Sequence, residues 1–535
     1  MRPASLRRER HFGDRVVACH VERPPSLAAM LADAVRLRPQ GEALVCGARR
    51  MSWAEVDERA RRVAGGFVEI GVRPGDRVAL LLGNDVEFVL AALGATLAGA
   101  IVVPLSVREQ APGIAYILQH CAARVLVHDT ALAPRLPAAG DAPALLARVG
   151  VGGDGAGALP FERLAAAAPL GAPHAAAEDD VAAILYTSGT TGRPKGAMLT
   201  HLGIVHSATN YQLAFELGPE DRCAVVVPLS HVTGLVALMA VALRIAGALV
   251  VVPAFKAAEF LPLAARERMS FTVMVPAMYA LCLLQPDFAA HDLAAWRVGG
   301  FGGAPMAPSV IDELAERLPN LALANCYGAT ETTSPATIMP PHLTRAHLAS
   351  VGLPVPGAEV AVMDDDGREV PPGETGEIWL RGAMVVKGYW DNPQASAENI
   401  VSGFWRSGDV GTVDAGGFLH VHDRKKDMLN RGGYKIFSVE VENALARHPG
   451  VLEAAVVGRP CPVLGERVHV FVTAKEGPLP EAADLQAFCA AQLADYKVPE
   501  TFTIGREPLP RNANGKLLKR ELRERLLAEG TDRPA

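Results

Sequence analysis

The sequence lacks closely spaced cysteine pairs. Its eight cysteines are scattered along the chain, and no two of them form a C-x-x-C pair. Neither a zinc site nor a disulfide framework is indicated, because both usually need cysteines at short, recurring spacings. Unpaired cysteines favour a reducing compartment, so the expected location is the cytoplasm.

An excess of positive charge is also missing. Lys and Arg together number 52, Asp and Glu number 58, and the formal net charge is −6. A mildly acidic chain has no general electrostatic attraction for nucleic acid. We therefore expect no nucleic-acid partner.

A clear membrane-spanning run is absent as well. Residues 88–105 carry no charged side chain, but two glycines and Pro104 interrupt them. This length is at the lower limit of a membrane helix, and a helix that leads into a buried strand explains it better. Arg7 and Arg8 are followed by acidic residues where a signal peptide needs an apolar segment. We expect neither a membrane span nor a signal peptide.

Short β-branched segments alternate with helix-length amphipathic segments. Strands are expected at residues 77–82, 100–104, 124–127, 182–186, 223–227, 248–252, 272–275 and 321–325, and helices at residues 86–98, 114–120, 201–215, 234–245 and 309–318. Such alternation predicts an α/β fold with largely parallel sheets covered by helices.

The length of 535 residues exceeds what one hydrophobic core usually organises, so we expect several domains. Residues 135–173 are rich in Ala, Gly and Pro and are predicted to be a connecting segment. The predicted parts are an N-terminal arm (1–25), a large domain of parallel sheets (26–425) with a small β subdomain (358–422), and a small, mobile α/β C-terminal domain (426–535).

The most specific local signal is the segment from Tyr186 to Gly196, with the sequence YTSGTTGRPKG. It directly follows an expected strand. Its glycines permit unusual φ angles, and its free N–H groups and hydroxyls can surround phosphate oxygens beside the charge of Lys195. The segment is not a Walker A loop, and the chain contains neither G-x-S-x-G nor H-E-x-x-H. A G-x-G-x-x-G match at residues 150–155 lacks a following helix, so no nicotinamide site is predicted.

This segment and six others resemble, in the same order, the motifs of the AMP-forming acyl-CoA synthetase, adenylation-domain and luciferase superfamily. The other six are Pro228–Gly234, Gly302–Pro305, Asn325–Glu331, Trp405–Asp409, Asp423–Asp427 and Pro510–Lys516. Seven matches in order leave little room for chance.

The resemblance implies roles for particular residues. Catalytic roles fall to Lys516, Thr191, Glu331 and His231. ATP or AMP binding falls to Thr187, Ser188, Gly189, Thr190, Thr191, Gly192, Lys195, Gly303, Ala304, Pro305, Asn325, Tyr327, Gly328, Thr330, Asp409 and Arg424. The acid pocket is expected at His231, Val232, Gly300, Phe301 and Gly302, the domain hinge at Lys426, and the loop that faces CoA at Gly432 and Gly433.

The chemistry of these residue types suits the implied roles. Glu331 follows a strand end, and its carboxylate offers the hard oxygen that Mg²⁺ prefers, with Thr191 as a second candidate ligand. Tyr327 offers a flat face to adenine. Asp409 can accept two hydrogen bonds from the ribose hydroxyls, and Arg424 can contact the ribose or its phosphate.

Three positions depart from the usual pattern of this superfamily. Asp423 stands where glycine is common, Ser407 where threonine is common, and Ser230 where an aromatic residue often precedes the histidine. The first two changes are mild. Ser230 bears on the acid pocket and therefore on which substrate fits.

The resulting prediction is a carboxylic acid–CoA ligase with Mg²⁺, ATP and CoA. The apolar residues around the expected acid pocket favour a fatty or aromatic monocarboxylic acid over a dicarboxylic acid or an amino acid, and between the first two a fatty acid is slightly preferred. Two alternatives remain open: an adenylating enzyme that loads a carrier protein, and a nucleotide-binding homologue without catalysis. A homodimer is one option that the sequence leaves open.

Lys516 provides a test of the predicted chemistry. We expect Lys516→Ala to slow adenylate formation by about a hundredfold, because a positioned cation stabilises the charge that develops as pyrophosphate leaves. Thioester formation from supplied acyl-adenylate should be largely retained. Separate assays of the two half-reactions check this, and an equal loss of both would contradict the assigned role.

Overall fold

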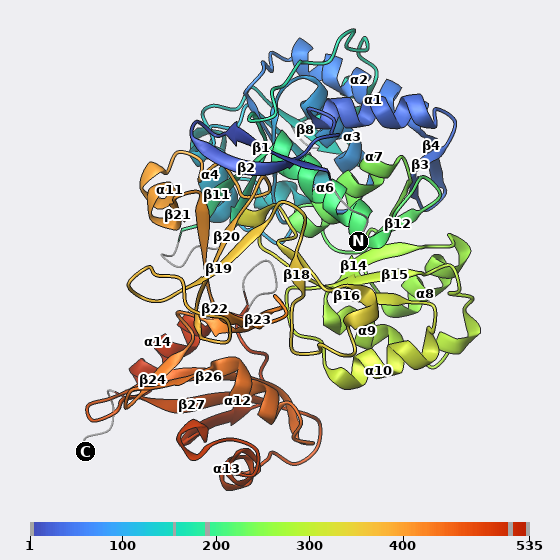
Figure 1. Cartoon of the computed structure of the whole chain (residues 1–535). Coiled ribbons are helices and arrows are strands. Elements are labelled where there is room, and N and C mark those ends of the chain that lie inside the picture. Colours follow the sequence, from blue (N-terminus) through green and yellow to red (C-terminus); the bar gives the residue numbers. More distant parts are fainter. Residues whose placement is uncertain (1–4, 154–156, 188–192, 512–516, 531–535) are drawn as a thin grey trace. The chain divides into compact units, whose positions relative to one another are not determined.

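The computed structural model describes residues 5–153, 157–187, 193–511 and 517–530, and Figure 1 shows its elements. The predicted α/β class with large parallel sheets is confirmed. Within the described ranges, no helix is long and apolar enough to cross a membrane. All eight cysteines lie in these ranges as buried, free thiols.

One sheet carries the glycine-rich segment at its edge. Its order is β11 (Lys195–Thr200), β10 (Val181–Thr187), β6 (Ile101–Pro104), β5 (Arg77–Leu81), β7 (Val125–Asp129), β8 (Ala147–Val151) and β9 (Leu159–Pro160). All neighbours run parallel except β10 and β11. Val125, Leu126 and Val127 have no exposed surface, as expected for a strand covered on both faces.

A second sheet contains a parallel centre with antiparallel ends. Its order is β18 (Leu353–Pro354), β17 (Thr337–Ile338), β16 (Ala322–Tyr327), β15 (Val298–Phe301), β14 (Phe271–Met274), β12 (Arg222–Val225), β13 (Ala248–Val251), β3 (Glu42–Cys46) and β4 (Arg49–Ser52). The strands from β16 to β3 run parallel. Their carboxyl ends therefore lie at the same edge of the sheet.

The helices accompany these strands. They are α1 (Leu27–Leu37), α2 (Trp53–Glu69), α3 (Val86–Leu97), α4 (Ala111–His120), α5 (Phe161–Ala165), α6 (His201–Phe215), α7 (Val241–Ile245), α8 (Ala257–Arg266), α9 (Pro276–Leu283), α10 (Pro308–Arg317) and α11 (Pro393–Asn399). α3 is buried on nearly all sides because almost all of its side chains are apolar, and α6 is buried along most of its length although about half of its side chains are polar. The side chain of Thr200 caps α6 by accepting a hydrogen bond from the backbone of Gly203.

The later part of the chain has smaller sheets. One has the order β19 (Glu359–Met363), β20 (Gly376–Arg381), β22 (Phe404–Val413) and β21 (Ile400–Val401), with β23 (Leu419–Arg424) beside β22. The last has the order β25 (Tyr434–Ile436), β24 (Leu429–Arg431), β27 (Gly465–Ala474) and β26 (Val451–Cys461), with β28 (Thr501–Gly505) beside β27. Its helices are α12 (Ser438–Leu445), α13 (Ala482–Ala490) and α14 (Lys519–Gly530).

The chain divides into two compact units. The first contains residues 1–360, 379–406 and 417–419, and the second contains residues 361–378, 407–416 and 420–535. The domain limits taken from the sequence, including the hinge at Lys426, stay predictions.

The helix expected at residues 234–245 is present, but its first part is a π-helix, η3 (Thr233–Ala240), which α7 continues. One local expectation was wrong. Residues 135–173 were expected only to connect, but they supply β8, β9 and α5. The low β-propensity of Gly150 argues against a strand, so β8 was not predicted; parallel pairing with the neighbouring strand β7 stabilises it.

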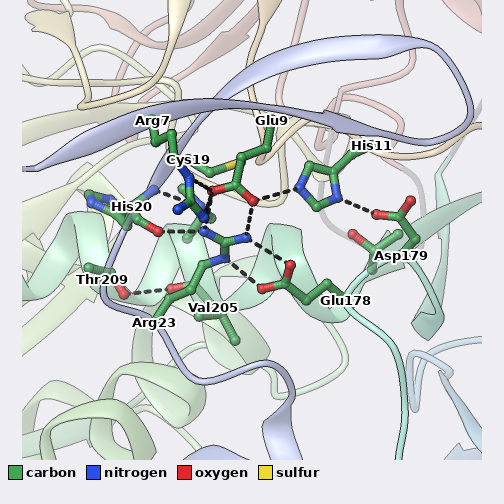
Figure 2. Close-up of polar contacts among 12 residues, drawn as sticks. Arg7, Glu9, His11, Cys19, His20, Arg23, Glu178, Asp179, Val205 and Thr209 are labelled. Carbon is green, nitrogen blue, oxygen red and sulfur yellow. Dashed lines mark hydrogen bonds and ion pairs between the residues drawn. The ribbon is translucent and has the colours of Figure 1, made fainter.

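Within the first unit, the N-terminal residues form a hairpin of β1 (Leu6–His11) and β2 (Arg15–His20). Arg23, just after it, has a side chain only 7% exposed. Its guanidinium contacts both carboxylate oxygens of Glu9, at 3.0 and 2.8 Å, and both of Glu178, at 2.6 and 2.8 Å (Figure 2). These hydrogen bonds lower the pKa of Glu9 to about 2, although burial acts to raise it.

Removal of Arg23 tests this anchor. We expect Arg23→Ala to lower the free energy of unfolding by about 3 kcal/mol, because two partly buried carboxylates lose their partner. The depressed pKa of Glu9 stabilises the fold above its ordinary value of 4.5, and this contribution is lost as the pH falls toward about 2. Denaturant titrations should therefore show the difference between wild type and variant shrinking over that interval.

Arg36→Ala is the matched control, because Arg36 is 76% exposed and forms an ion pair with Asp33 across one helical turn. It should change the free energy of unfolding by less than about 0.5 kcal/mol. If the difference in free energy of unfolding between wild type and Arg23→Ala stayed constant between pH 4.5 and 2, the loss of stability would not depend on the protonation of Glu9.

Candidate active site

Glu331 is a buried carboxylate with two hydroxyl donors. It lies in the short helix η5 (Thr330–Thr332), just after β16, and is 9% exposed. Its Oε1 accepts hydrogen bonds from Thr187 Oγ1 at 3.2 Å and from Tyr389 Oη at 3.1 Å. Thr187 is the last residue of β10, so the contact joins the end of one sheet to the end of the other.

The turn after Glu331 is held in an unusual conformation. Thr333 and Ser334 have φ angles of 49° and 43°, in the left-handed region that a β-branched residue rarely adopts. The turn is secured by a hydrogen bond of 3.0 Å between the hydroxyls of Tyr211 and Ser334, both buried. Strain of this kind is retained where the surrounding structure fixes a functional group, which supports a role for Glu331.

Tyr389 is a site residue that the sequence analysis missed. Gly388 and Trp390 exchange backbone hydrogen bonds with β11, so the strand that leaves the glycine-rich segment positions this tyrosine. Burial raises the pKa of the Tyr389 hydroxyl well above its ordinary range, and the charge of Glu331 adds to this. The hydroxyl therefore stays protonated and donates to the carboxylate. No sequence pattern separates it from an ordinary packed tyrosine.

Lys195 also lies close to this group. Its Nζ is 5.2 Å from the centre of the Tyr389 ring, a distance typical of a cation–π contact. Thr187 and Lys195 are paired residues of β10 and β11. The structure thus brings together three predicted residues, Thr187, Lys195 and Glu331.

The expected acid and adenine motifs lie at adjacent strand ends. Phe301 of β15 is paired with Asn325 of β16, and Tyr327 ends β16. A Cβ atom on Gly302 would collide with the carbonyl oxygen of Cys326, so only glycine fits at this approach of two strands. The other members of these motifs follow the same strand ends: Gly300, Gly303, Ala304, Pro305, Gly328 and Thr330.

A buried tyrosine holds the backbone of β15 close to its carboxyl end. Tyr279 is fully buried and donates a hydrogen bond of 2.8 Å to the carbonyl oxygen of Gly300. This contact holds the backbone of β15 in place. Tyr279 lies in α9 and had no signal in the sequence.

His231 and Val232 lie in the turn that follows β12. Because β12 is parallel to β14, and β14 to β15, this turn opens at the same sheet edge as Phe301 and Tyr327. The buried side chain of Asn84 shapes the turn, because it donates to Val227 O at 3.0 Å and accepts from Leu229 N at 2.8 Å. The π-helix η3 begins directly after Val232, and π-helical turns are frequent at functional sites.

The second unit contains the remaining predicted residues. Asp409 is 7% exposed, and its carboxylate lies 3.0 Å from Arg424 Nε. Ser407, where threonine is common, still uses its hydroxyl to accept from Asp409 N at 2.9 Å and to donate to Ile378 O at 2.6 Å. Asp423, in place of the common glycine, accepts hydrogen bonds from Arg424 N and Ser438 N and so caps the start of α12.

Lys426 and the glycine loop belong to the same unit. Burial lowers the pKa of Lys426, whose carbonyl oxygen accepts a hydrogen bond from Arg523. Gly432 and Gly433 form the turn between β24 and β25, with φ angles of 59° and 91°. These angles favour glycine, which leaves the backbone of the turn open to close approach.

Six predicted residues lie outside the described ranges. They are Ser188, Gly189, Thr190, Thr191, Gly192 and Lys516. Their roles stay predictions.

A buried carboxylate beside Thr187, at the carboxyl ends of parallel strands, is typical of an α/β nucleotide-binding enzyme. The family described as "AMP-binding enzyme" matches residues 31–390, and "AMP-binding enzyme C-terminal domain" matches residues 440–516. The chain belongs to the AMP-binding enzyme family. The resemblance found in the motifs is thereby confirmed.

Similar proteins span nearly the whole chain. Feruloyl-CoA synthase from Amycolatopsis is 36% identical and covers 92% of this chain and 97% of its own length. The fatty acid–[acyl-carrier-protein] ligase ScoC from Streptomyces coeruleorubidus is 34% identical, with coverages of 91% and 94%. The anthranilate CoA ligase AuaEII, solved with anthranoyl-AMP, has a TM-score of 0.87 at 27% identity, with coverages of 95% and 99%. The chain is an AMP-forming acid–thiol ligase.

The hydroxyl of Tyr389 can be tested alone. Tyr389→Phe removes one of the two donors to Glu331 Oε1, and a hydrogen bond to a charged group contributes about 1.5–3 kcal/mol. We expect acid-dependent pyrophosphate release to slow by about tenfold or more, with an unchanged circular dichroism spectrum. Tyr434→Phe, at a 59% exposed tyrosine, is the control and should keep full activity. Full activity of Tyr389→Phe would show that Glu331 does not depend on this contact.

Proposed function

We propose that this chain is a carboxylic acid–CoA ligase for apolar monocarboxylic acids. ATP activates the acid as an acyl-adenylate with release of pyrophosphate, and CoA then takes the acyl group with release of AMP. The observation that carries the proposal is the buried Glu331 carboxylate, held by Thr187 at the end of the phosphate-binding segment.

The first half-reaction makes and breaks one bond each at the α-phosphorus. An oxygen of the substrate carboxylate attacks phosphorus, and the bond to pyrophosphate breaks. The oxygen atoms that meet here belong to the Glu331 carboxylate and to the hydroxyls of Thr187 and Tyr389, and oxygen ligands of this kind fit Mg²⁺. Glu331 would hold the ion with the hydroxyl of Thr187 beside it, and the ion supplies positive charge to the phosphate oxygens. Lys195 adds a fixed positive charge at the same strand end.

The nucleoside part is proposed to rest on the other predicted residues. Tyr327 would stack on adenine, with Gly303, Ala304 and Pro305 at its edge. Asp409, whose carboxylate is already oriented by Arg424, would accept hydrogen bonds from the ribose hydroxyls. Positioning of this kind can supply a large part of the rate increase, because it replaces chance encounters by a fixed geometry.

The second half-reaction transfers the acyl group. The thiol of CoA attacks the acyl carbon and AMP leaves as the carbon–oxygen bond breaks. We propose that the turn at Gly432 and Gly433 faces the pantetheine arm and that Lys426 is the hinge between the two half-reactions. The positive φ angles of the two glycines support a backbone that a thin chain can approach.

The acid pocket is proposed at the strand ends of the second sheet. Val232 is partly buried, Phe301 is buried, and Gly300 and Gly302 have no side chain, so these four residues bring no charged group to the proposed pocket. This suits a fatty or aromatic monocarboxylic acid better than a dicarboxylic acid or an amino acid. Relatives named for ferulate and for fatty acids support the same class.

A carrier protein as the acyl acceptor is the second candidate. It is favoured by the similarity to ScoC, which is named as a ligase of fatty acids to acyl-carrier protein. The first half-reaction would be the same. The two candidates differ only in the thiol that displaces AMP.

A substrate panel separates these possibilities. Fatty acids of graded length, cinnamates, benzoates and amino acids are incubated with Mg²⁺ and ATP, with and without CoA, and the products are identified by mass. We expect an apolar acid to give acyl-CoA, with AMP release at least tenfold faster in the presence of CoA.

The other outcomes are informative as well. Acyl-adenylate that accumulates and ignores CoA would assign the acceptor role to a carrier protein. A preference for dicarboxylic or amino acids would overturn the apolar pocket, and ATP binding without turnover of any acid would indicate a homologue without catalysis.

A further inference from the structure

Three metal-ligating side chains meet on one face of the N-terminal hairpin, far from the nucleotide residues in sequence. Glu9 and His11 are two residues apart on β1, and Cys19 lies on β2 opposite Arg7. The alternation of side chains along a strand places all three on the same face. One ligand atom from each, a carboxylate oxygen, an imidazole nitrogen and a thiol sulfur, lies within 4.8 Å of the other two.

His11 is the group that points to a ligand. It is only 8% exposed, and its Nε2 is buried without a hydrogen-bond partner among the described residues. This atom lies 3.6 Å from Glu9 Oε2, toward which it is directed (Figure 2). With its proton on Nδ1, a neutral imidazole would face this carboxylate with the lone pair of Nε2, which is unfavourable unless a proton or a metal ion lies between the two atoms.

The other nitrogen of His11 already has its partner. Nδ1 lies 2.7 Å from Asp179 Oδ1, and a carboxylate there keeps the ring proton on Nδ1. The lone pair of Nε2 is then free to bind a cation. Histidines that ligate metals usually show this arrangement, in which an outer carboxylate fixes the tautomer and the ring orientation.

The ligand set selects the type of cation. Ca²⁺ and Mg²⁺ prefer oxygen ligands alone, whereas a thiolate, an imidazole and a carboxylate together suit Zn²⁺ and similar borderline metals. A nitrogen and an oxygen ligand of tetrahedral zinc are about 3.3–3.5 Å apart, given bond lengths of about 2.0–2.2 Å. The separation of 3.6 Å between His11 Nε2 and Glu9 Oε2 is slightly above that interval, so a small rotation of either side chain brings the two atoms to it.

The local charges also allow a divalent cation. Arg7 and Arg23 both donate to Glu9, but Glu178 and Asp179 lie in the same cluster as further carboxylates (Figure 2). Burial raises the pKa of the Cys19 thiol to about 12, so this group is neutral before a metal binds, but the three carboxylates still outnumber the two arginines. The incoming cation therefore neutralises the cluster instead of adding to a positive one.

We propose that Glu9, His11 and Cys19 bind one zinc ion, with solvent in the fourth position. The Cys19 thiol releases its proton to solvent as the sulfur–zinc bond forms. Bound zinc fixes β1 to β2 and to Asp179. The same hairpin carries Arg15, whose guanidinium donates to the carbonyl oxygens of Val386 at 2.9 Å and Lys387 at 2.7 Å, two residues before Tyr389.

Cobalt substitution in the full chain tests this site directly. Purified protein is stripped with a chelator and titrated with Co²⁺, which replaces zinc and is coloured. We expect saturation at one ion per chain, with the visible bands of a tetrahedral centre and a near-ultraviolet sulfur–cobalt band. Zn²⁺ should displace the cobalt and abolish the colour. Wild-type protein that shows no sulfur–cobalt band on titration would overturn the proposal.

Variants assign the ligands. Cys19→Ser should lose the sulfur–cobalt band, and His11→Gln should weaken cobalt binding by at least tenfold. Asp179→Asn should weaken it by about 10–100-fold while the band is retained, because Asp179 supports His11 and the backbone of Phe12 but is not itself a ligand. Cys282→Ser is the matched control, because Cys282 is equally buried but belongs to α9.

The outcomes are distinguishable from a failure to fold. Circular dichroism without metal should show that the wild type and each variant are folded at the temperature of the titration. A sulfur–cobalt band that persists in Cys19→Ser would place the metal elsewhere. Equal affinity in wild type and His11→Gln would mean that a proton, and not a metal, occupies the space between His11 and Glu9.

Discussion

The structure of the first unit depends on the need to satisfy a buried carboxylate. Glu331 is removed from solvent, and an ionised group in that position is costly unless it is hydrogen-bonded. Its donors come from different parts of the chain: Thr187 ends a strand of one sheet, and Tyr389 lies on a segment paired with β11. The strained turn at Thr333 and Ser334 presents the carboxylate to both.

Parallel pairing explains why the other candidate residues lie near this carboxylate. The strands from β12 to β16 end at one edge of the second sheet, so the turns that follow them share that edge. Glycine at position 302 allows two strand ends to approach more closely than any side chain would permit. The π-helix after Val232 and the buried Asn84 set the direction of the His231 turn.

The N-terminal hairpin contacts the segment that carries Tyr389. Arg23 binds Glu9 and Glu178, and Arg15 holds the backbone just before Tyr389. The arm at residues 1–25 is thus a structural part of the first unit. In the proposed zinc site, the ligands come from both strands of the hairpin and include one cysteine. A search for C-x-x-C pairs in the sequence therefore does not find them.

The sequence by itself determined the α/β class, most of the strands and helices, and the family. Periodicity and alternation are local properties, and motifs such as Tyr186–Gly196 and Asn325–Glu331 are specific as ordered strings. Only the tertiary structure decided which donors satisfy Glu331, that residues 233–240 form a π-helix, and that Glu9, His11 and Cys19 share one face. These features depend on contacts between residues that are far apart in the chain or on strand register, and neither is encoded in local spacing.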